Sequence, residues 1–431
     1  MLNNSSFKNL IGNLDSEGKV IHVSDPTDPA IEVCAAAAKH LGTTMLFENL
    51  KGFPGFKGVT EVLKSEQVFE QIYNMDYISF LNHVSQAVAC PIPCVEAEKP
   101  IWVNKKDSLK DLPIPRYFEN DGGLYIAGGM LILNYPGSTA CNISFNRLMV
   151  VDDSHLAFNI HKGKHTDLLC NDAEKKGERI PAAIIIGAEP SVMVAAASPA
   201  PWGTDELDVA SAIKTSPISV MSWNGIKIPA DAEIVIMGYV ENEKVPEGPF
   251  VDYLGVMHGQ GKGRLFSVDS IYCADDPVFH ALMPGASKEH LQLMAVPVEA
   301  EIAQRLRKLT RFKDVTLTRE SGLFHAVISI DKSTDGEAKT ALMATLSSYP
   351  FIKHAVVVDA DVDIRDSAAV EKAIALCVQA DKDVIVVPGL KATMVDPRTA
   401  PDMLGAKMGI DATRPVSSDK EKYEPIPWPE I

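Results

Sequence analysis

The 431-residue sequence has little positive charge, few aromatic residues and no long uninterrupted apolar run. Lysine and arginine together number 41 against 57 aspartates and glutamates, which gives a formal net charge of −16 at pH 7. This acidic balance disfavours binding to nucleic acid or to anionic membranes, because their phosphates attract cations. Small anionic ligands remain compatible with it, since a local group of cations can outweigh a distant negative average.

Membrane segments and a disulfide pattern are also missing. The most apolar stretch, residues 180–201, is interrupted by Glu189-Pro190, where a spanning helix would need unbroken apolar character. We therefore expect a strand, a turn and a helix of small residues there. The first residues contain no apolar run of the kind that a signal peptide requires. Seven scattered cysteines, with Cys90 and Cys94 lacking the second pair of a zinc site, favour a reducing cytoplasm.

Changes in pattern divide the chain into three folded regions and a tail. Residues 1–105 and 291–416 alternate helical and strand-like segments, whereas residues 106–290 contain short β-type runs separated by glycine, proline and aspartate. These patterns predict a mixed α/β multidomain fold: an N-terminal α/β domain, a central β-barrel or sandwich, and a C-terminal domain whose helices cover a sheet. Residues 417–431 lose all periodicity and are expected to form an extended or partly disordered arm.

Start and stop signals place two further helices. Asp28-Pro29 and Gly42 predict a helix between them, and the periodic pattern of residues 296–309 predicts another helix. The glycine-rich stretch HGQGKGR, residues 258–264, has neither G-x-G-x-x-G spacing nor a P-loop pattern. We expect a flexible hairpin there rather than a nucleotide site.

The central region holds an unusual number of polar side chains within β-rich sequence. Asn142 and Arg147 lie in CNISFNRLMVV, His161 and His165 lie in HKGKH, and Glu206 opens a helical pattern. Each has an ordinary structural explanation: a surface cation at a strand end, imidazoles in a lysine-rich loop, or a carboxylate that caps a helix. Taken singly, none of them indicates catalysis.

The segment PEGPFVD places Glu247 and Asp252 five residues apart around a Gly-Pro pair. A solvated turn would explain both acids. The apolar residues Phe250 and Val251 between them, with YLGV following, instead favour a partly apolar pocket around Asp252. A carboxyl group in such a pocket can keep its proton near neutral pH and act as a general acid.

Taken together, these segments resemble the UbiD family of decarboxylases, which use prenylated FMN. Residues 142–147 are similar to the family's N-x-S/G-x-x-R pattern, and further matches are GKH ending at His165, the D-E pair at Glu206, and EGPFVD. PADAEIVIMG, GASKEHLQLM and KMGIDATRP extend the resemblance over most of the chain in the same order. It implies a flavin-binding split β-barrel in the centre and a C-terminal αβα domain that mediates homodimerisation.

The resemblance also implies a metal site. Asn142, His165 and Glu206 would hold a divalent ion, usually Mn²⁺, that also contacts the flavin phosphate, and a potassium ion would lie nearby. An amide oxygen, an imidazole and a carboxylate suit Mn²⁺ and differ from the thiolate ligands of a structural zinc site.

The catalytic group that the resemblance implies consists of Arg147, Glu247 and Asp252. Arg147 would orient the substrate carboxylate, Glu247 would hold Arg147 in place, and Asp252 would supply the proton that replaces CO₂. The side chains that the resemblance places around the cofactor are Ser144, Phe145, Arg147, Lys164, Ser198 and Lys353.

The implied reaction is non-oxidative decarboxylation, or its reversal, of an α,β-unsaturated or (hetero)aromatic carboxylic acid. EGPFVD and the compact length are most similar to the branch that includes archaeal-type enzymes acting on trans-anhydromevalonate 5-phosphate. The expected partners are therefore this kind of acid, CO₂ and a flavin prenyltransferase that supplies the cofactor. A phosphorylated substrate would need further cations, for which Lys262, Arg264 and Lys288 are candidates, although solvated loop cations are more common.

Two alternatives belong to other classes of protein. A non-catalytic flavin-binding subunit of a larger carboxylase complex would not need Arg147, Glu247 and Asp252 together. The other alternative is a metal hydrolase that uses His161, His165 and Glu206. The sequence lacks the compact H-E-x-x-H signature that such an enzyme would be expected to have.

Overall fold

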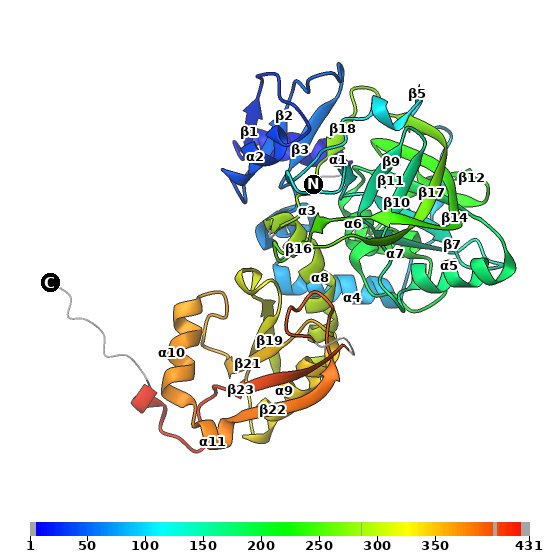
Figure 1. The fold of residues 1–431 in the computed structure, drawn as a ribbon. Helices are drawn as coiled ribbons and strands as arrows, with labels where there is room; N and C mark the ends of the chain where they lie inside the picture. Colours follow the sequence, from blue (N-terminus) through cyan, green and yellow to red (C-terminus); the bar gives the residue numbers. More distant parts are fainter. Residues whose placement is uncertain (1–5, 286, 400–402, 424–431) are drawn as a thin grey trace. The chain divides into compact units, whose positions relative to one another are not determined.

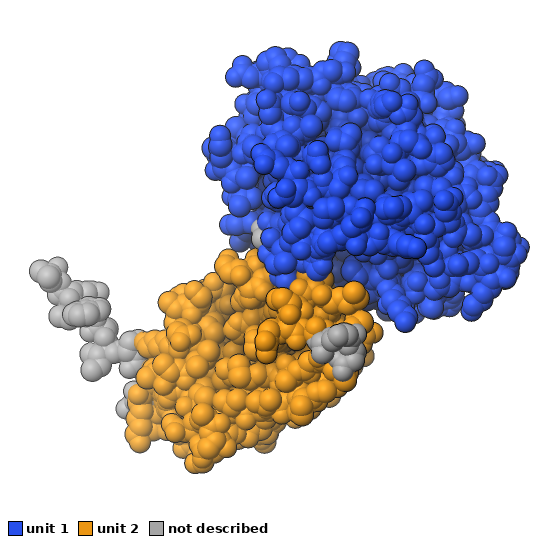
Figure 2. All heavy atoms as spheres, in the orientation of Figure 1, with its two compact units in different colours: residues 1–297 blue, residues 298–431 orange. Residues whose placement is uncertain are grey.

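The computed structural model describes residues 6–285, 287–399 and 403–423. The chain forms two compact units, residues 1–297 and residues 298–431 (Figure 2). No helix within the described ranges is long and apolar enough to cross a membrane. Of the expected C-terminal arm, residues 420–423 form the short 3₁₀ helix η3, and residues 424–431 lie outside the described part.

The first unit begins with a four-stranded sheet in the order β1-β2-β3-β18 (Figure 1). Its last strand comes from far along the chain and pairs parallel with β3. The strands of this sheet are β1 (Val20–Val23), β2 (Thr44–Phe47), β3 (Lys57–Thr60) and β18 (Val278–His280). The helices of this part are α1 (Phe7–Ser16), α2 (Glu32–Ala38), α3 (Glu66–Tyr73) and α4 (Tyr77–Ala89).

Helix α2 is shorter than the expected helix between Asp28-Pro29 and Gly42. The Asp28 carboxylate accepts a hydrogen bond from the backbone N–H of Ala30, and the Glu32 carboxylate accepts one from the N–H of Asp28. Ile31 has a positive φ of 75°. These local bonds form a turn, so regular helix begins only at Glu32.

A nine-stranded sheet forms the centre of the first unit, with eight strands in the order β6-β9-β10-β17-β14-β11-β7-β8 and β5 paired to β17. The inner faces of these strands are apolar and bury a continuous core. Within the described residues the ladder is an open path with β6 and β8 at its ends, so the barrel is split. The strands are β5 (Asn104–Lys106), β6 (Tyr125–Ile126), β7 (Met130–Asn134), β8 (Cys141–Phe145), β9 (Leu148–Asp152), β10 (His155–Phe158), β11 (Ile180–Ile186), β14 (Ile234–Glu247) and β17 (Gly261–Cys273).

The smaller elements of the first unit surround this sheet. Residues 180–201 form strand β11, a turn and the buried helix α6 (Pro190–Ala197), as the interrupted apolar stretch predicts. The other helices here are α5 (His165–Lys176) and α7 (Glu206–Lys214). The remaining strands are β4 (Val95–Glu96), β12 (Ser219–Trp223) and β13 (Ile226–Pro229) in one sheet, and β15 (Phe250–Val251) and β16 (Met257–His258) in a hairpin.

The glycine-rich stretch 258–264 is only in part the expected hairpin. Gly261 to Arg264 begin strand β17 and pair with the end of β14. A Cβ atom on Gly263 would lie 2.8 Å from the carbonyl oxygen of Phe158 and 3.0 Å from Cβ of Glu247. Glycine is therefore needed there for close packing of the strands, and not for flexibility.

The second unit contains a five-stranded sheet in the order β19-β20-β21-β23-β22, against which α9 and α10 pack (Figure 1). Residue 298, where this unit begins, lies inside α8 (Lys288–Leu306). The strands are β19 (Phe312–Leu317), β20 (His325–Ile330), β21 (His354–Asp359), β22 (Val384–Lys391) and β23 (Leu404–Asp411). The helices are α9 (Gly336–Ser348), α10 (Ser367–Cys377) and α11 (Ala380–Asp383), with the 3₁₀ helices η1 (Leu109–Asp111) in the first unit and η2 (Arg319–Ser321) in the second.

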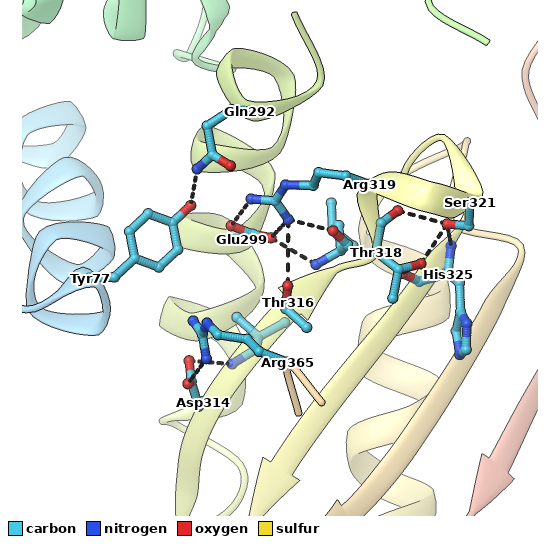
Figure 3. Close-up of polar contacts among 12 residues, drawn as sticks. Tyr77, Gln292, Glu299, Asp314, Thr316, Thr318, Arg319, Ser321, His325 and Arg365 are labelled. Atoms are coloured by element: carbon cyan, nitrogen blue, oxygen red, sulfur yellow. Dashed lines mark hydrogen bonds and ion pairs between the residues drawn. The ribbon is translucent and has the colours of Figure 1, made fainter. Parts of the chain in front are cut away.

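A buried ion pair joins the helix and the sheet of the second unit. Figure 3 shows the Arg319 guanidinium facing the Glu299 carboxylate, with the two charged groups 2.5 Å apart. The same carboxylate accepts a hydrogen bond from the backbone N–H of Leu317 at the end of β19. Because Glu299 is fully buried, these bonds offset the cost of removing its charge from water.

Candidate active site

Arg147 and Glu247 form an ion pair at one end of the central sheet. Arg147 lies between β8 and β9, and Glu247 is the last residue of β14. Arg147 Nη2 donates to Glu247 Oε2 at 2.8 Å. The Glu247 side chain is only 1% exposed, whereas that of Arg147 is 21% exposed. The buried carboxylate thus holds one edge of a guanidinium group that is partly open to solvent.

Tyr125 holds the other oxygen of the same carboxylate. Its hydroxyl donates to Glu247 Oε1 at 3.1 Å and accepts from the backbone N–H of Gly248 at 3.1 Å. Its ring lies 4.1 Å from the ring of Phe250, over which Arg147 also sits. Burial and the nearby charge of Glu247 raise the pKa of Tyr125, so the phenol remains a donor. In the sequence this tyrosine lies in an apolar strand pattern, and no motif singled it out.

Asp252 organises the turn that follows β15. Its Oδ1 accepts hydrogen bonds from the backbone N–H groups of Leu254 and Val256, at 2.8 and 3.0 Å. Its Oδ2 lies 2.5 Å from Nε2 of His258, which belongs to β16. The Asp252 side chain is 8% exposed and that of His258 is 37% exposed. Asp252 is therefore nearly buried but hydrogen-bonded to a residue that reaches solvent.

The three expected catalytic residues form two groups. Among the interactions of the described residues, no hydrogen bond or ion pair joins Asp252 directly to Arg147 or Glu247. A nearby histidine is influenced by both groups. Surrounding protein atoms, and then the charges of Lys164, Arg147 and His258, lower the pKa of His161.

Asn142, His165 and Glu206 come together, although they lie on three different elements. Asn142 is in β8, and His165 and Glu206 are the first residues of α5 and α7. Asn142 Nδ2 donates to Glu206 Oε2 at 2.8 Å, and the backbone N–H of Ile143 donates to the same oxygen at 2.6 Å. His165 Nδ1 lies 3.9 Å from Glu206 Oε1.

The chemistry of this trio suits a divalent cation. Burial raises the pKa of Glu206 to about 8, which indicates a carboxylate that lacks a compensating positive charge. Burial, and then the charge of Lys164, lower the pKa of His165, so its imidazole is neutral and keeps a lone pair. In the part of the chain that the structure describes, no three or more His, Cys, Asp and Glu side chains form a metal-binding group. Asn142, His165 and Glu206 fall outside that definition because Asn142 contributes an amide in place of a third ionisable side chain.

The expected flavin contacts occupy different places. The Ser144 hydroxyl is 3.1 Å from the hydroxyl of Thr166, which donates to Asn142 Oδ1, so Ser144 belongs to the network of the trio. The Ser198 hydroxyl donates to the carbonyl oxygen of Val194 at the end of α6. Phe145 is half-buried at the end of β8, Lys164 is exposed before α5, and Lys353 lies in the second unit, paired with Asp396 at 2.9 Å.

The three cationic residues that are candidates for binding a substrate phosphate differ in their exposure and pairing. Arg264 is buried and pairs with Glu174 at 2.5 Å, and its guanidinium also donates to Asn171. Its charge is therefore already neutralised within the fold. Lys262 and Lys288 are exposed.

Models of three protein domains match the chain in sequence order. These are the N-terminal domain of 3-octaprenyl-4-hydroxybenzoate carboxy-lyase at residues 11–88, its Rift-related domain at residues 91–287 and its C-terminal domain at residues 291–412. Together the three UbiD domains account for nearly the whole described chain.

Relatives and solved structures agree with this match. The anhydromevalonate phosphate decarboxylase of Methanosarcina mazei is 34% identical over 99% of this chain and 100% of its own length. The enzyme of the same name from Methanocaldococcus jannaschii is 33% identical over 93% of this chain and 96% of its own. The structure of the UbiD-class enzyme HmfF from Pelotomaculum thermopropionicum in complex with FMN has a TM-score of 0.93 at 32% identity, covering 98% of this chain and 97% of that one.

The chain therefore belongs to the UbiD family and is a decarboxylase of the UbiD class. The family, the carboxy-lyase class and the mixed α/β multidomain fold predicted from the sequence are confirmed. The alternative of a non-catalytic subunit is not favoured, since the relatives from Methanosarcina mazei and Methanocaldococcus jannaschii, which match nearly the full chain, are named as decarboxylases.

Proposed function

We propose that this protein is a prenylated-FMN-dependent decarboxylase of anhydromevalonate phosphate or of a closely similar α,β-unsaturated acid. The observation that carries the proposal is the Arg147–Glu247 pair, in which a buried carboxylate fixes a partly exposed guanidinium group. The names of the relatives and the complexes of HmfF with FMN and, in an evolved dimeric form, with prFMN support the substrate and the cofactor. Prenylated FMN, when bound, supplies an electron sink for the charge left behind by the departing CO₂.

Arg147 binds and orients the substrate carboxylate. Glu247 uses one Nη of the guanidinium, so other donors of the same planar group remain for the substrate. Tyr125 fixes Glu247 from the opposite side, which limits movement of the whole pair. Asp252 then supplies the proton that takes the place of CO₂ on carbon.

Asn142, His165 and Glu206 would hold a divalent cation, proposed to be Mn²⁺ with K⁺ nearby, and this cation would supply positive charge for the flavin phosphate. The uncompensated burial of the Glu206 carboxylate supports this assignment. Ser144, Phe145, Lys164, Ser198 and Lys353 are the proposed protein contacts of the cofactor. A flavin prenyltransferase in the cytoplasm supplies the prenylated flavin.

The proposed assembly is a homodimer formed through the second unit. Apolar side chains are exposed on and beside the edge strand β22, namely Val386 at 64%, Met394 at 68% and Leu404 at 47%. An edge strand with exposed apolar side chains tends to be covered by another chain. Light scattering of the purified protein at several concentrations tests this assembly, and a monomer at all concentrations would reject it.

The function is tested with protein coexpressed with a flavin prenyltransferase. Mass spectrometry of the released small molecule should identify prenylated FMN, and the holoenzyme should release CO₂ from trans-anhydromevalonate 5-phosphate. Failure with this acid but turnover of another would reject the substrate and retain the class.

The metal site is tested with two histidine variants that lie four residues apart. His165→Ala should lower both the metal and the flavin content of the purified protein, because it removes a neutral nitrogen ligand. His161→Ala should leave both contents close to those of the wild type. Equal occupancy in all three proteins would reject His165 as a ligand.

A further inference from the structure

Decarboxylation consumes a proton in every turnover, because hydrogen replaces the lost carboxylate on carbon. If Asp252 supplies this proton, as proposed above, it must be protonated again before the next cycle. Its side chain is 8% exposed, and Oδ1 already accepts two backbone hydrogen bonds. Only Oδ2 is therefore placed to take up and release a proton.

The group hydrogen-bonded to Oδ2 is the imidazole of His258. Nε2 lies 2.5 Å from Oδ2, and 37% of the His258 side chain is exposed. Histidine is the side chain that most readily exchanges protons with water near neutral pH. The pair thus connects a nearly buried acid to the solvent through one titratable ring.

We propose that His258 is the proton relay that reloads Asp252 from water. The Nε2–H bond of the imidazolium breaks as the Oδ2–H bond of Asp252 forms. This proton then passes from Oδ2 to the substrate carbon that has lost CO₂. The neutral imidazole takes its next proton from water, so each cycle consumes one solvent proton and needs no other reactant.

The hairpin geometry keeps the relay in place. Phe250 and His258 are opposite each other in the β15–β16 ladder, and the backbone N–H of Asp252 donates to the carbonyl oxygen of Val256. Gly285 donates its N–H to the carbonyl oxygen of Asp252. The backbone of Asp252 is therefore fixed through both its N–H and its C=O groups, and His258 is held opposite Phe250 in the other strand of the hairpin.

Two other histidines near this group are less suited to the role. Burial lowers the pKa of His290 to about 4 against the opposing charges of Glu289 and then Asp252, so this ring is uncharged at neutral pH. His161 is influenced by His258 and Arg147, and its pKa is also lowered. Among the described residues, His258 is the histidine hydrogen-bonded to Asp252.

The chain contains a matched control pair outside the site. His155 Nδ1 lies 2.8 Å from Asp152 at the turn between β9 and β10, and the two side chains are 34% and 54% exposed. The histidine is as exposed as His258, but its aspartate is open to water and needs no relay. His155→Gln should therefore leave turnover unchanged.

The test compares His258→Gln, His258→Ala and His155→Gln in holoenzyme loaded with prenylated FMN, with trans-anhydromevalonate 5-phosphate as the substrate. Glutamine keeps an N–H donor for Asp252 but cannot carry a proton, so His258→Gln should lower kcat by roughly 10–100-fold, less than the roughly 10²–10⁴-fold contribution of a general acid. The kcat of His258→Ala should fall by a similar factor, and added imidazole should restore much of it. KM should change little in either variant. A wild-type rate in His258→Gln, or no imidazole response in His258→Ala, would overturn the relay.

A second measurement does not depend on substrate. In the cofactor-free protein, nitrogen-15 NMR should show the Nε2 proton of His258 exchanging with water faster than a typical turnover rate of about 10 s⁻¹. Slower exchange would overturn the relay whatever the substrate is. By contrast, full activity of Asp252→Asn would reject Asp252 as the acid, and so the proposed mechanism itself.

Discussion

Two groups of buried carboxylates differ in how their oxygens are paired. At the end of β14, each oxygen of the Glu247 carboxylate has a hydrogen-bond partner. Glu61 and Glu289 lie between β3 and the start of α8, and each of them leaves one carboxylate oxygen unpaired. Glu247 is held by Arg147 and Tyr125. In the second cluster Glu289 Oε1 accepts from His280 Nε2 at 3.1 Å, and its backbone N–H donates to Glu61 Oε2 at 3.2 Å. Glu61 Oε1 and Glu289 Oε2 have no hydrogen-bond partner within the described ranges.

The difference lies in the compensating charge and its access to solvent. Glu247 is paired with a permanent cation that is partly exposed, so the pair can receive an anionic ligand. Glu61 lies beside a second carboxylate, and burial followed by the charge of Glu289 raises the pKa of Glu61 to about 7. This raised pKa favours the protonated form of Glu61, whose side chain is buried together with that of Glu289. The first arrangement leaves part of a fixed cation exposed to solvent, and the second connects the residue after β3 to the start of α8.

The largest effect is expected from removing Asp252, the acid that the proposed mechanism uses together with the Arg147–Glu247 pair. Asp252→Asn keeps the shape of the turn but cannot deliver a proton, so steady turnover should fall by roughly 10²–10⁴-fold. Flavin and metal content, measured on the same purified protein, should match the wild type. Asp252→Glu should retain part of the activity, because the acid remains and only its reach changes. Turnover of Asp252→Asn near the wild-type rate would assign this aspartate to the turn alone.

A smaller effect is expected from removing the hydrogen bond between Tyr125 and Glu247, which no sequence motif indicated. Tyr125→Phe keeps the ring against Phe250 and removes one hydrogen bond to a charged group, which is worth about 1.5–3 kcal/mol. We expect kcat/KM to fall roughly 10–100-fold, with the thermal midpoint measured alongside. Tyr117→Phe is the matched control, since its ring also packs on Phe250, at 6.2 Å, without a hydrogen bond to Glu247 among those of the described residues. Equal losses in the two variants would mean that Tyr125 acts only through packing.

How much the sequence could predict depended on whether a signal was local. Glu189-Pro190 within an apolar run correctly predicted a strand, a turn and a helix, because Glu189 caps α6 by accepting from the N–H of Ser191. The helix expected at residues 296–309 begins earlier, at Lys288, and contains Pro297. Buried packing on both sides of the proline overrides its usual role as a helix breaker.

Contacts between distant segments were beyond local patterns. Arg147 and Glu247 are 100 residues apart, and only the family resemblance paired them before the structure placed their charged groups together. Tyr125 lies in an ordinary apolar strand pattern, and His258 lies at the start of a glycine-rich stretch that favours a turn. Their importance follows from the hydrogen bonds that they make across the fold, for which a single sequence carries no periodic or compositional signal.

The smallest effect on activity is expected in the second cluster, where the change should appear in stability. Folded Glu61 keeps its proton up to about pH 7, whereas in the unfolded chain it loses the proton near its ordinary pKa of 4.5. The free energy of unfolding should therefore fall by roughly 3 kcal/mol as pH rises through this window. The backbone N–H of Glu289, then the Ser287 hydroxyl and the charge of Lys64, lessen this rise in the pKa of Glu61 but do not cancel it.

Glu61→Gln is neutral at every pH and should remove this loss. The variant should be more stable than the wild type at pH 8 and differ little at pH 4, while kcat stays unchanged. Denaturant midpoints measured at both values test this. A parallel pH dependence in the two proteins would mean that Glu61 is already ionised in the folded state, and that the two carboxylate clusters are more alike than their surroundings indicate.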